Sequence, residues 1–292
     1  MLAGAGFFSA MAALTHELRD VLSWQTIALV RTGLALVIAA AMTYAAGARF
    51  VFLRPATLWI RSLAGSCSLV LTFYALTHSH SLSAVLVLTN MFPVWVALLS
   101  WPVLGTVPNS ATWVAIACGM TGVIVIQQPA HADFDFALLA AALGSLTTSI
   151  AMLGLHRLHH LDPRSIVVHF SGVSVLFCLA AHLLPLEKGY EHLDDPLNVA
   201  MLLGVGVTAT MGQLFLTKAF AAGSPAKVSV VGLSQVGITA CVDLWHNHTF
   251  SSQRLIGMLL IIAPTIWLLL RSDAPAATTI VPPDETVPPQ VE

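Results

Sequence analysis

Amide side chains inside apolar segments are the residues of this sequence best placed to bind a small molecule. Asn90 lies one turn before Pro93, and two glutamines, Gln213 and Gln235, lie in later apolar stretches. A polar group without a partner is costly in an apolar environment, so each amide must bond to a neighbouring helix or face a polar cavity. Pro93 has no N–H and frees a backbone carbonyl near Asn90. We predict a shared substrate cavity that also includes Ser234, with interhelical hydrogen bonds as the alternative.

Ionic and aromatic residues in the same segments suggest further roles. Arg31 could attract an anionic substrate, pair with Asp243 or Glu17, or extend its charge to the membrane interface. Asp243 is the candidate for a proton-coupled carboxylate, the alternative being an acid solvated at a helix end. Trp95 could stack on an aromatic substrate, although packing is the more common role of such a ring. We therefore predict Asp243, Arg31 and Pro93 as coupling or gating residues, and Trp95 as a substrate contact.

A histidine cluster is the strongest indication of a different chemistry. His156, His159 and His160 form the pattern HxxHH, which is typical of membrane di-iron desaturases and hydroxylases. Imidazoles at these spacings can bind one metal from a helix end. Such a site needs several clusters on one membrane face, and no second HxxHH or HxxxH occurs. A polar loop is the favoured interpretation, so we predict no enzyme, no catalytic residue, no metal and no cofactor.

The composition decides which elements position these residues. Of 292 residues, 57% are hydrophobic and only 9% are charged, with a mean hydropathy of +0.84. About a quarter of the residues in a soluble domain are charged, so lipid must cover much of this surface. The net charge of −2 and the lack of a basic patch argue against nucleic acid. Four cysteines stand singly in apolar runs, which indicates buried thiols without disulfides or zinc.

Long uncharged runs predict membrane-spanning helices. No charged residue occurs between Arg61 and Asp133, and further uncharged runs follow. Each run approaches the roughly 20 residues that cross a bilayer as a helix. We expect ten helices. The first is predicted to be a membrane helix and not a cleaved signal peptide. Because its apolar stretch is short at the start, a few further residues are expected upstream. The predicted spans are 2–17, 25–46, 57–76, 82–104, 111–127, 134–155, 164–184, 197–220, 227–245 and 253–271.

Basic residues indicate the orientation. Ten helices place both termini on one side, and eight basic residues fall in loops on that side against three on the other. The positive-inside rule then predicts a multi-pass protein of the plasma (inner) membrane with both termini in the cytoplasm. The eight are Arg49, Arg54, Arg61, Arg157, Arg164, Lys218, Lys227 and Arg271.

Weak internal similarity suggests two repeats. Aligning Tyr74 with Lys218 places Trp101 on Trp245, and Ser234 comes at the position that repeats Asn90. Five helices per half force the second half to be inverted in the membrane, as in many secondary transporters. We predict repeats over residues 1–128 and 129–272, followed by a disordered Pro-rich tail over residues 273–292.

The sequence resembles the drug/metabolite transporter superfamily in its EamA-like ten-helix form, over about residues 1–271. The resemblance is carried by the segments 24–31, 73–76, 93–95, 119–122 and 212–219. It implies a permease with a central cavity and alternating access. Members commonly carry a Gly-Glu pair after the fourth and the ninth helix, and here Thr106 and His248 occupy the glutamate positions.

Together these features predict an all-α integral membrane protein that moves a small metabolite or drug-like molecule across the membrane. Its expected partners are this small molecule and the lipid bilayer, and a homodimer stays open. The alternative is the di-iron enzyme built on His156 to His160. Substrate, direction and coupling ion are left open by the sequence.

Overall fold

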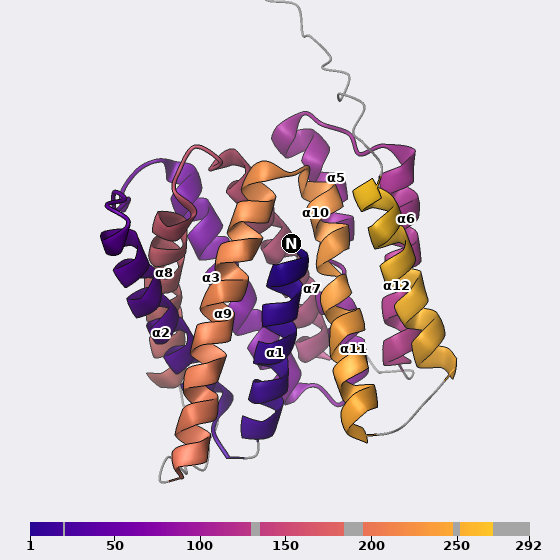
Figure 1. The fold of residues 1–292 in the computed structure, drawn as a ribbon, viewed down its shortest axis with the longest axis horizontal. Helices are drawn as coiled ribbons and strands as arrows, with labels where there is room; N and C mark the ends of the chain where they lie inside the picture. The colour runs from indigo at the N-terminus through magenta and orange to yellow at the C-terminus, as the bar shows by residue number, and fades with distance from the viewer. Residues whose placement is uncertain (20, 130–134, 184–194, 248–251, 271–292) are drawn as a thin grey trace, which may run out of the picture.

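The structure is a computed structural model that describes residues 1–19, 21–129, 135–183, 195–247 and 252–270. In these ranges the chain forms α-helices and no strand, which confirms the predicted all-α fold (Figure 1). The predicted tail, residues 273–292, lies outside the described residues. The helices are α1 (Leu2–Leu18), α2 (Trp24–Ala45), α3 (Ala56–His78), α4 (Leu82–Thr89), α5 (Phe92–Leu104), α6 (Ser110–Gln127), α7 (Phe136–Arg157), α8 (Pro163–Leu183), α9 (Pro196–Ala222), α10 (Pro225–Gly232), α11 (Ser234–Asn247) and α12 (Ser252–Leu270).

These helices correspond to the ten predicted spans. Nine spans in the described residues are long and apolar enough to cross a membrane, with α4 and α5 forming one span and α10 and α11 another. The remaining helix, α1, has 17 residues, at the short end of the range for a spanning helix. The first and last helices, α1 and α12, run in opposite directions, as an even number of crossings requires (Figure 1).

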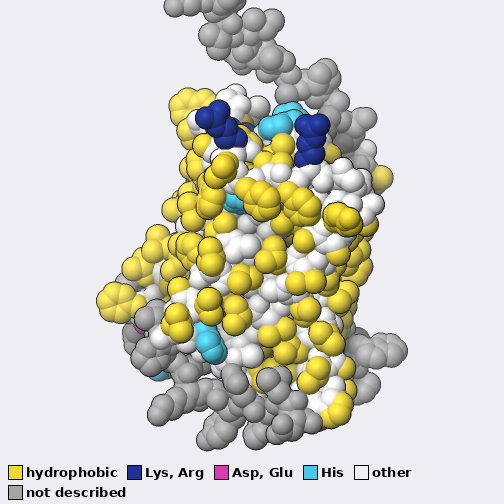
Figure 2. Space-filling model, turned by 90° about the vertical axis from the view of Figure 1, so that its left-hand side faces the viewer, with side chains coloured by type: hydrophobic (Ala, Val, Ile, Leu, Met, Phe, Trp, Pro, Cys, Tyr) yellow, Lys and Arg dark blue, Asp and Glu magenta, His cyan; other side chains and the backbone are white. Residues whose placement is uncertain are grey.

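Polar caps and apolar outer faces explain where these helices begin and what covers them. Side chains at the N-termini of five helices accept a hydrogen bond from a first-turn N–H; they are Ser23, Ser81, Asn109, Asp135 and Asp195. Large apolar side chains such as Val37 and Leu176 point outward. Figure 2 shows the resulting apolar face, with Lys and Arg side chains gathered at its upper end. The outer surface therefore matches a lipid environment.

Two of the predicted spans are broken. The 82–104 span, expected as one helix containing Asn90 and Pro93, ends as α4 at Thr89 and restarts as α5 at Phe92. Pro93 lies in the first turn of α5, where its missing N–H is tolerated. The 227–245 span breaks at Leu233, where the Ser234 hydroxyl donates to the Val231 carbonyl at 2.7 Å. Both breaks leave irregular backbone within the bundle.

Helix packing has the same pattern when the two halves are exchanged. The order α1, α2, α3, α4/α5, α6 corresponds to α7, α8, α9, α10/α11, α12. The α1–α9 pair then corresponds to α7–α3, and α2–α9 corresponds to α8–α3. The α2–α8 and α6–α12 pairs correspond to themselves. This packing is what two superposable halves related by a pseudo-twofold axis would produce.

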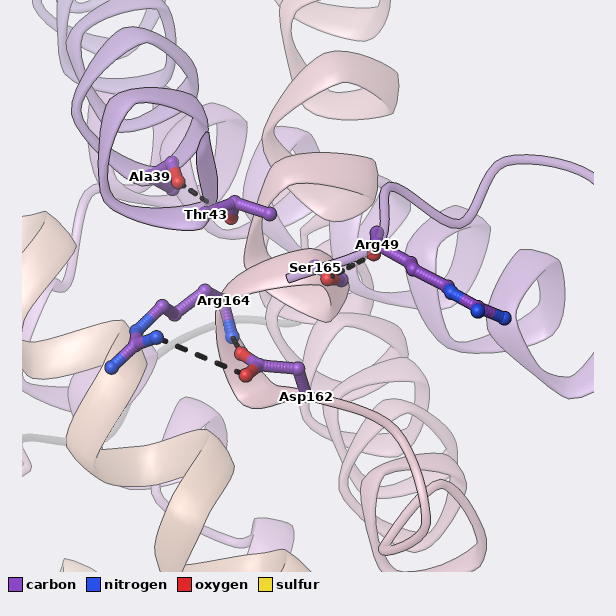
Figure 3. A network of polar contacts seen from close by, with 6 residues as sticks. All are labelled: Ala39, Thr43, Arg49, Asp162, Arg164 and Ser165. Carbon is purple, nitrogen blue, oxygen red and sulfur yellow. Dashed lines mark hydrogen bonds and ion pairs between the residues drawn. The ribbon is translucent and has the colours of Figure 1, made fainter. Parts of the chain in front are cut away.

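A polar network lies at one end of the bundle, where the segment after α2 meets the start of α8. Asp162 accepts from the backbone N–H of Arg164 at 2.8 Å, and its other oxygen lies 3.9 Å from the Arg164 guanidinium. The Ser165 hydroxyl donates to the Arg49 carbonyl at 2.7 Å, which attaches the start of α8 to the segment after α2. The side chain of Arg49 extends away from these contacts and is exposed (Figure 3).

Candidate functional site

A cavity of about 300 Å³ lies inside the bundle. Its walls come from α1, α2, α3, α7, α8 and α9 and from both broken spans. Phenylalanine rings and aliphatic side chains cover much of it, among them Phe8, Phe73, Phe92, Phe170 and Leu216. This volume lies at the lower end of the range for small-molecule sites.

The three predicted amides all line this cavity. Asn90 lies at the α4/α5 break, Gln235 lies just after the α10/α11 break, and Gln213 lies on α9. The Asn90 amide nitrogen donates to the Leu86 carbonyl at 2.7 Å, so its oxygen is left for another partner. The Gln213 amide nitrogen is buried and has no hydrogen-bond partner among the described residues. The structure thus brings together amides that are 123 and 22 positions apart in the sequence.

Other predicted site residues lie elsewhere. The Trp95 indole N–H donates to the Ser145 hydroxyl at 3.1 Å, which fixes the ring against α7. Trp95, Pro93 and Ser234 are not among the described residues that line the cavity. Asp243 belongs to α11, but its side chain lies outside the described residues. Of the two positions that replace family glutamates, Thr106 follows the left-handed Gly105 that ends α5, whereas His248 lies outside the described residues.

Two arginines face the cavity, and one of them differs from expectation. Arg31 on α2 lines it, so its side chain does not simply extend to the membrane interface. Arg61 falls in the predicted 57–76 span, but it was also counted among the loop cations on the basic side, and that count is wrong: it lies in α3 with 1% of its surface exposed, and it lines the cavity. The reason is tertiary, because the guanidinium packs over the Phe170 ring of α8 at 3.9 Å from its centroid.

Glycines make room for the Arg61 side chain. A Cβ atom at Gly65 would lie 2.9 Å from Phe170 Cε2 and 3.2 Å from Arg61 Nη1. A Cβ atom at Gly154 on α7 would lie 3.0 Å from Arg61 Cβ. Real Cβ atoms seldom approach neighbours so closely. The Arg61 side chain therefore lies in a space formed by three helices, and its Nε and Nη1 atoms have no hydrogen-bond partner among the described residues.

Hydroxyl groups complete the polar lining. Ser68 on α3 lies 2.5 Å from the Thr148 hydroxyl and 2.9 Å from the Gly144 carbonyl, both on α7. None of the described residues that line the cavity is aspartate or glutamate. With two arginines, three amides, hydroxyls and aromatic rings, the cavity can bind a small polar molecule and favours negative charge.

The histidine cluster has different surroundings. His156 Nδ1 lies 3.1 Å from the Phe220 carbonyl, and His159 Nδ1 lies 3.1 Å from the His156 carbonyl. The His159 and His160 rings meet edge to face with centroids 5.8 Å apart. In the part of the chain that the structure describes, no group of three or more His, Cys, Asp or Glu side chains could hold a metal ion. These contacts fit a helix-end packing role.

Comparisons with known proteins bear on the family. Residues 1–127 match the family model of the EamA-like transporter family. The pseudopaline exporter CntI of Pseudomonas aeruginosa, from two strains, is 27% identical over 228 residues, which cover 76% of this chain and 78% of the exporter. A crystal structure of another protein, 16% identical, superposes with a TM-score of 0.79 over 91% of this chain and 95% of that chain, and supports the fold.

These findings point to a transporter and not to an enzyme, and the apolar helices make the chain a multi-pass membrane protein. The prediction of an EamA-like protein is confirmed, because residues 1–127 match the EamA-like transporter family.

Proposed function

We propose that the chain is a secondary transporter that exports a small metabolite by alternating access around the central cavity. The observation that carries this proposal is the position of Asn90 and Gln235 at the two helix breaks, facing one cavity. Broken spanning helices whose irregular backbone lines a cavity are typical substrate sites of secondary transporters. The direction of transport is inferred from the similar exporter CntI.

The helix packing supports a rocking motion of two halves. The repeats over residues 1–128 and 129–272 would each keep their own fold while the α1–α9, α3–α7 and α2–α8 contacts slide. At the breaks, tighter bonds such as Met91 N–H to the Leu88 carbonyl and Leu233 N–H to the Val230 carbonyl interrupt the regular helical pattern, so the half-helices can bend there. Pro93 and Arg31, next to these elements, are gating candidates, and Asp243 is a candidate for ion coupling.

The charge distribution suggests the orientation. With Arg61 removed from the loop count, seven basic residues against three still favour one end of the bundle. This end, which includes the exposed Arg49 and the half-buried Arg164 of Figure 3, would face the cytoplasm of the inner membrane, with both termini on that side.

A ligand screen followed by transport measurement tests the function. Thermal shifts of the detergent-purified protein against a metabolite panel identify compounds that bind the folded state. Each stabilising compound is then offered to proteoliposomes in a counterflow assay. We expect saturable, protein-dependent exchange of one chemical class. Asn90→Ala and Gln235→Ala should each reduce exchange at least tenfold.

The control is Gln253→Ala, which removes an exposed amide whose oxygen accepts from Gln128 at 2.5 Å, away from the cavity. It should exchange the ligand like the wild type. Normal exchange by both cavity variants, with correct folding, would exclude the proposed site. If no member of the panel is exchanged, the transport proposal itself fails.

A further inference from the structure

Arg61 is a buried cation without a counter-ion in the cavity. Its side chain is 1% exposed, and Nε and Nη1 have no hydrogen-bond partner among the described residues. Removing a guanidinium from water without a partner is strongly unfavourable, and arginine stays protonated under nearly all conditions. The contact with the Phe170 ring offsets part of this penalty but satisfies no N–H group. The site is therefore incomplete in the structure.

Among the described residues, no aspartate or glutamate side chain lies beside Arg61 in the cavity to balance its charge. From Arg61 to Asp133 the sequence contains no aspartate or glutamate, and the described cavity lining contains none. The acids near the helix ends, such as Asp135, Asp162 and Asp195, cap helices or pair with basic residues there. Among the described residues none supplies a negative charge to Arg61, and a molecule that enters the cavity can supply it.

The fully buried polar atoms around this cavity that lack a partner among the described residues are all hydrogen-bond donors. They are Nε and Nη1 of Arg61 and the amide nitrogen of Gln213. A guanidinium binds the two oxygens of a carboxylate through parallel hydrogen bonds, and such charge-assisted bonds are about twice as strong as neutral ones. We propose that the cavity binds its substrate as an organic anion, with a carboxylate held by the Arg61 guanidinium. This rests on the proposed function, because the bound anion is taken to be the transported molecule.

Arg31 adds a second positive charge to the same cavity. It lies seven residues after the start of α2, and Arg61 lies five residues after the start of α3. The two helices are consecutive spans and run in opposite directions, so at about 1.5 Å per residue the two Cα atoms are on the order of 15 Å apart along the bundle. Their long side chains reach into one cavity from different depths. An anion in the cavity is thus attracted by two positive charges. The Arg61 guanidinium also supplies the hydrogen-bond donors for it.

The rest of the lining selects the organic part. Phe8, Phe73 and Phe92 cover the cavity together with Phe170, whereas the Asn90 amide oxygen stays free to accept a hydrogen bond. A carboxylate with an apolar or aromatic carbon skeleton fits these surfaces better than a small inorganic anion, because a small anion would leave the phenylalanine rings in contact with water.

The test compares the binding of carboxylates with the binding of uncharged primary amides that have the same carbon skeleton. Thermal shifts of the purified full-length protein are measured with benzoate, phenylacetate and succinate and with the corresponding primary amides, benzamide, phenylacetamide and succinamide. Inorganic phosphate is included to identify a site for phosphate, free or on a lipid headgroup. We expect at least one carboxylate to stabilise the wild type, and its amide to bind at least tenfold more weakly. Arg61→Gln should lose this preference, and Arg49→Gln, an exposed arginine, should keep it.

Each outcome decides between the proposals. If Arg61→Gln does not fold, the comparison of acid and amide on the wild type still applies, and Arg61→Lys should keep the preference with weaker binding. Equal responses to acid and amide, a response to phosphate alone, or unchanged binding by Arg61→Gln would overturn the anion inference. If a neutral or cationic compound binds and is exchanged by Arg61→Gln, the transporter proposal stands and only the substrate class is wrong. If no compound of any charge binds or is exchanged, both fail.

Discussion

Replacing Arg61 by methionine should make the substrate-free protein more stable. Nε and Nη1 of Arg61 are buried donors without partners, and the side chain lies in the space that Gly65 and Gly154 leave open. Methionine has a long, flexible, apolar side chain that fills irregular gaps, and it carries no N–H group. Arg61→Met therefore removes the unsatisfied donors and keeps much of the packing.

The expected gain follows from two opposing contributions. A buried donor without a partner destabilises a protein by about 1–3 kcal/mol, so two such donors contribute about 2–6 kcal/mol. The substitution also removes the contact of the guanidinium with the Phe170 ring, which stabilises by about 2 kcal/mol when desolvated. The net gain is about 0–4 kcal/mol, and each kcal/mol raises the midpoint by roughly 2 °C in a protein of this size.

Intrinsic fluorescence of the seven tryptophans can follow unfolding of the purified protein in detergent without any ligand. Wild type and variants are heated at one rate, because irreversible unfolding makes the midpoint depend on the rate. Arg49→Met is the matched control, since the Arg49 side chain is exposed, and its midpoint should change by less than about 1 °C. A clear fall in the midpoint of Arg61→Met alone would refute the reasoning, because it would mean that Arg61 has stabilising partners in the free protein.

Two further predictions concern helix packing. Gly257→Ala should destabilise the protein by about 1–3 kcal/mol, because its Cβ would lie 2.8 Å from the Gly122 carbonyl oxygen across the α6–α12 contact; thermal unfolding measures this, and an unchanged midpoint would contradict the close approach. His169→Ala should destabilise by about 1–3 kcal/mol, because the ring bonds to Ser62 at 2.8 Å and to the Phe52 carbonyl at 3.1 Å. Faster proteolysis of the segment 46–55 would accompany that loss, and resistance equal to the wild type would speak against it.

Much of the fold could be predicted because charge is so unevenly distributed. A charge inside lipid is unfavourable, so uncharged runs predict spans, and each predicted span corresponds to a helix or a pair of half-helices. The break near Asn90 could be anticipated from Pro93. The break at Leu233 has no proline at its centre, and sequence periodicity gives no other signal for it.

The site was only partly predictable for a similar reason. Amides in apolar segments predicted Asn90, Gln213 and Gln235, and all three line the cavity. Arg61 fell inside the predicted 57–76 span, and a charge within a span indicates a functional residue, so this signal was present. The space that holds it could not be predicted, because Gly65 and Phe170 are more than a hundred residues apart and belong to different helices.

An anionic substrate also explains how export could proceed without the family glutamates, whose positions hold Thr106 and His248. Moving one negative charge out of a cell with a negative interior releases about 2.3 kcal/mol per 100 mV, equivalent to a roughly 50-fold concentration gradient. No proton-binding carboxylate is then required. We expect efflux of the carboxylate from proteoliposomes to be accelerated by an inside-negative potassium diffusion potential and slowed by an inside-positive one, at equal pH on both sides. If a pH gradient drives efflux and the potential does not, proton coupling must replace this explanation, and Asp243 becomes the residue to substitute.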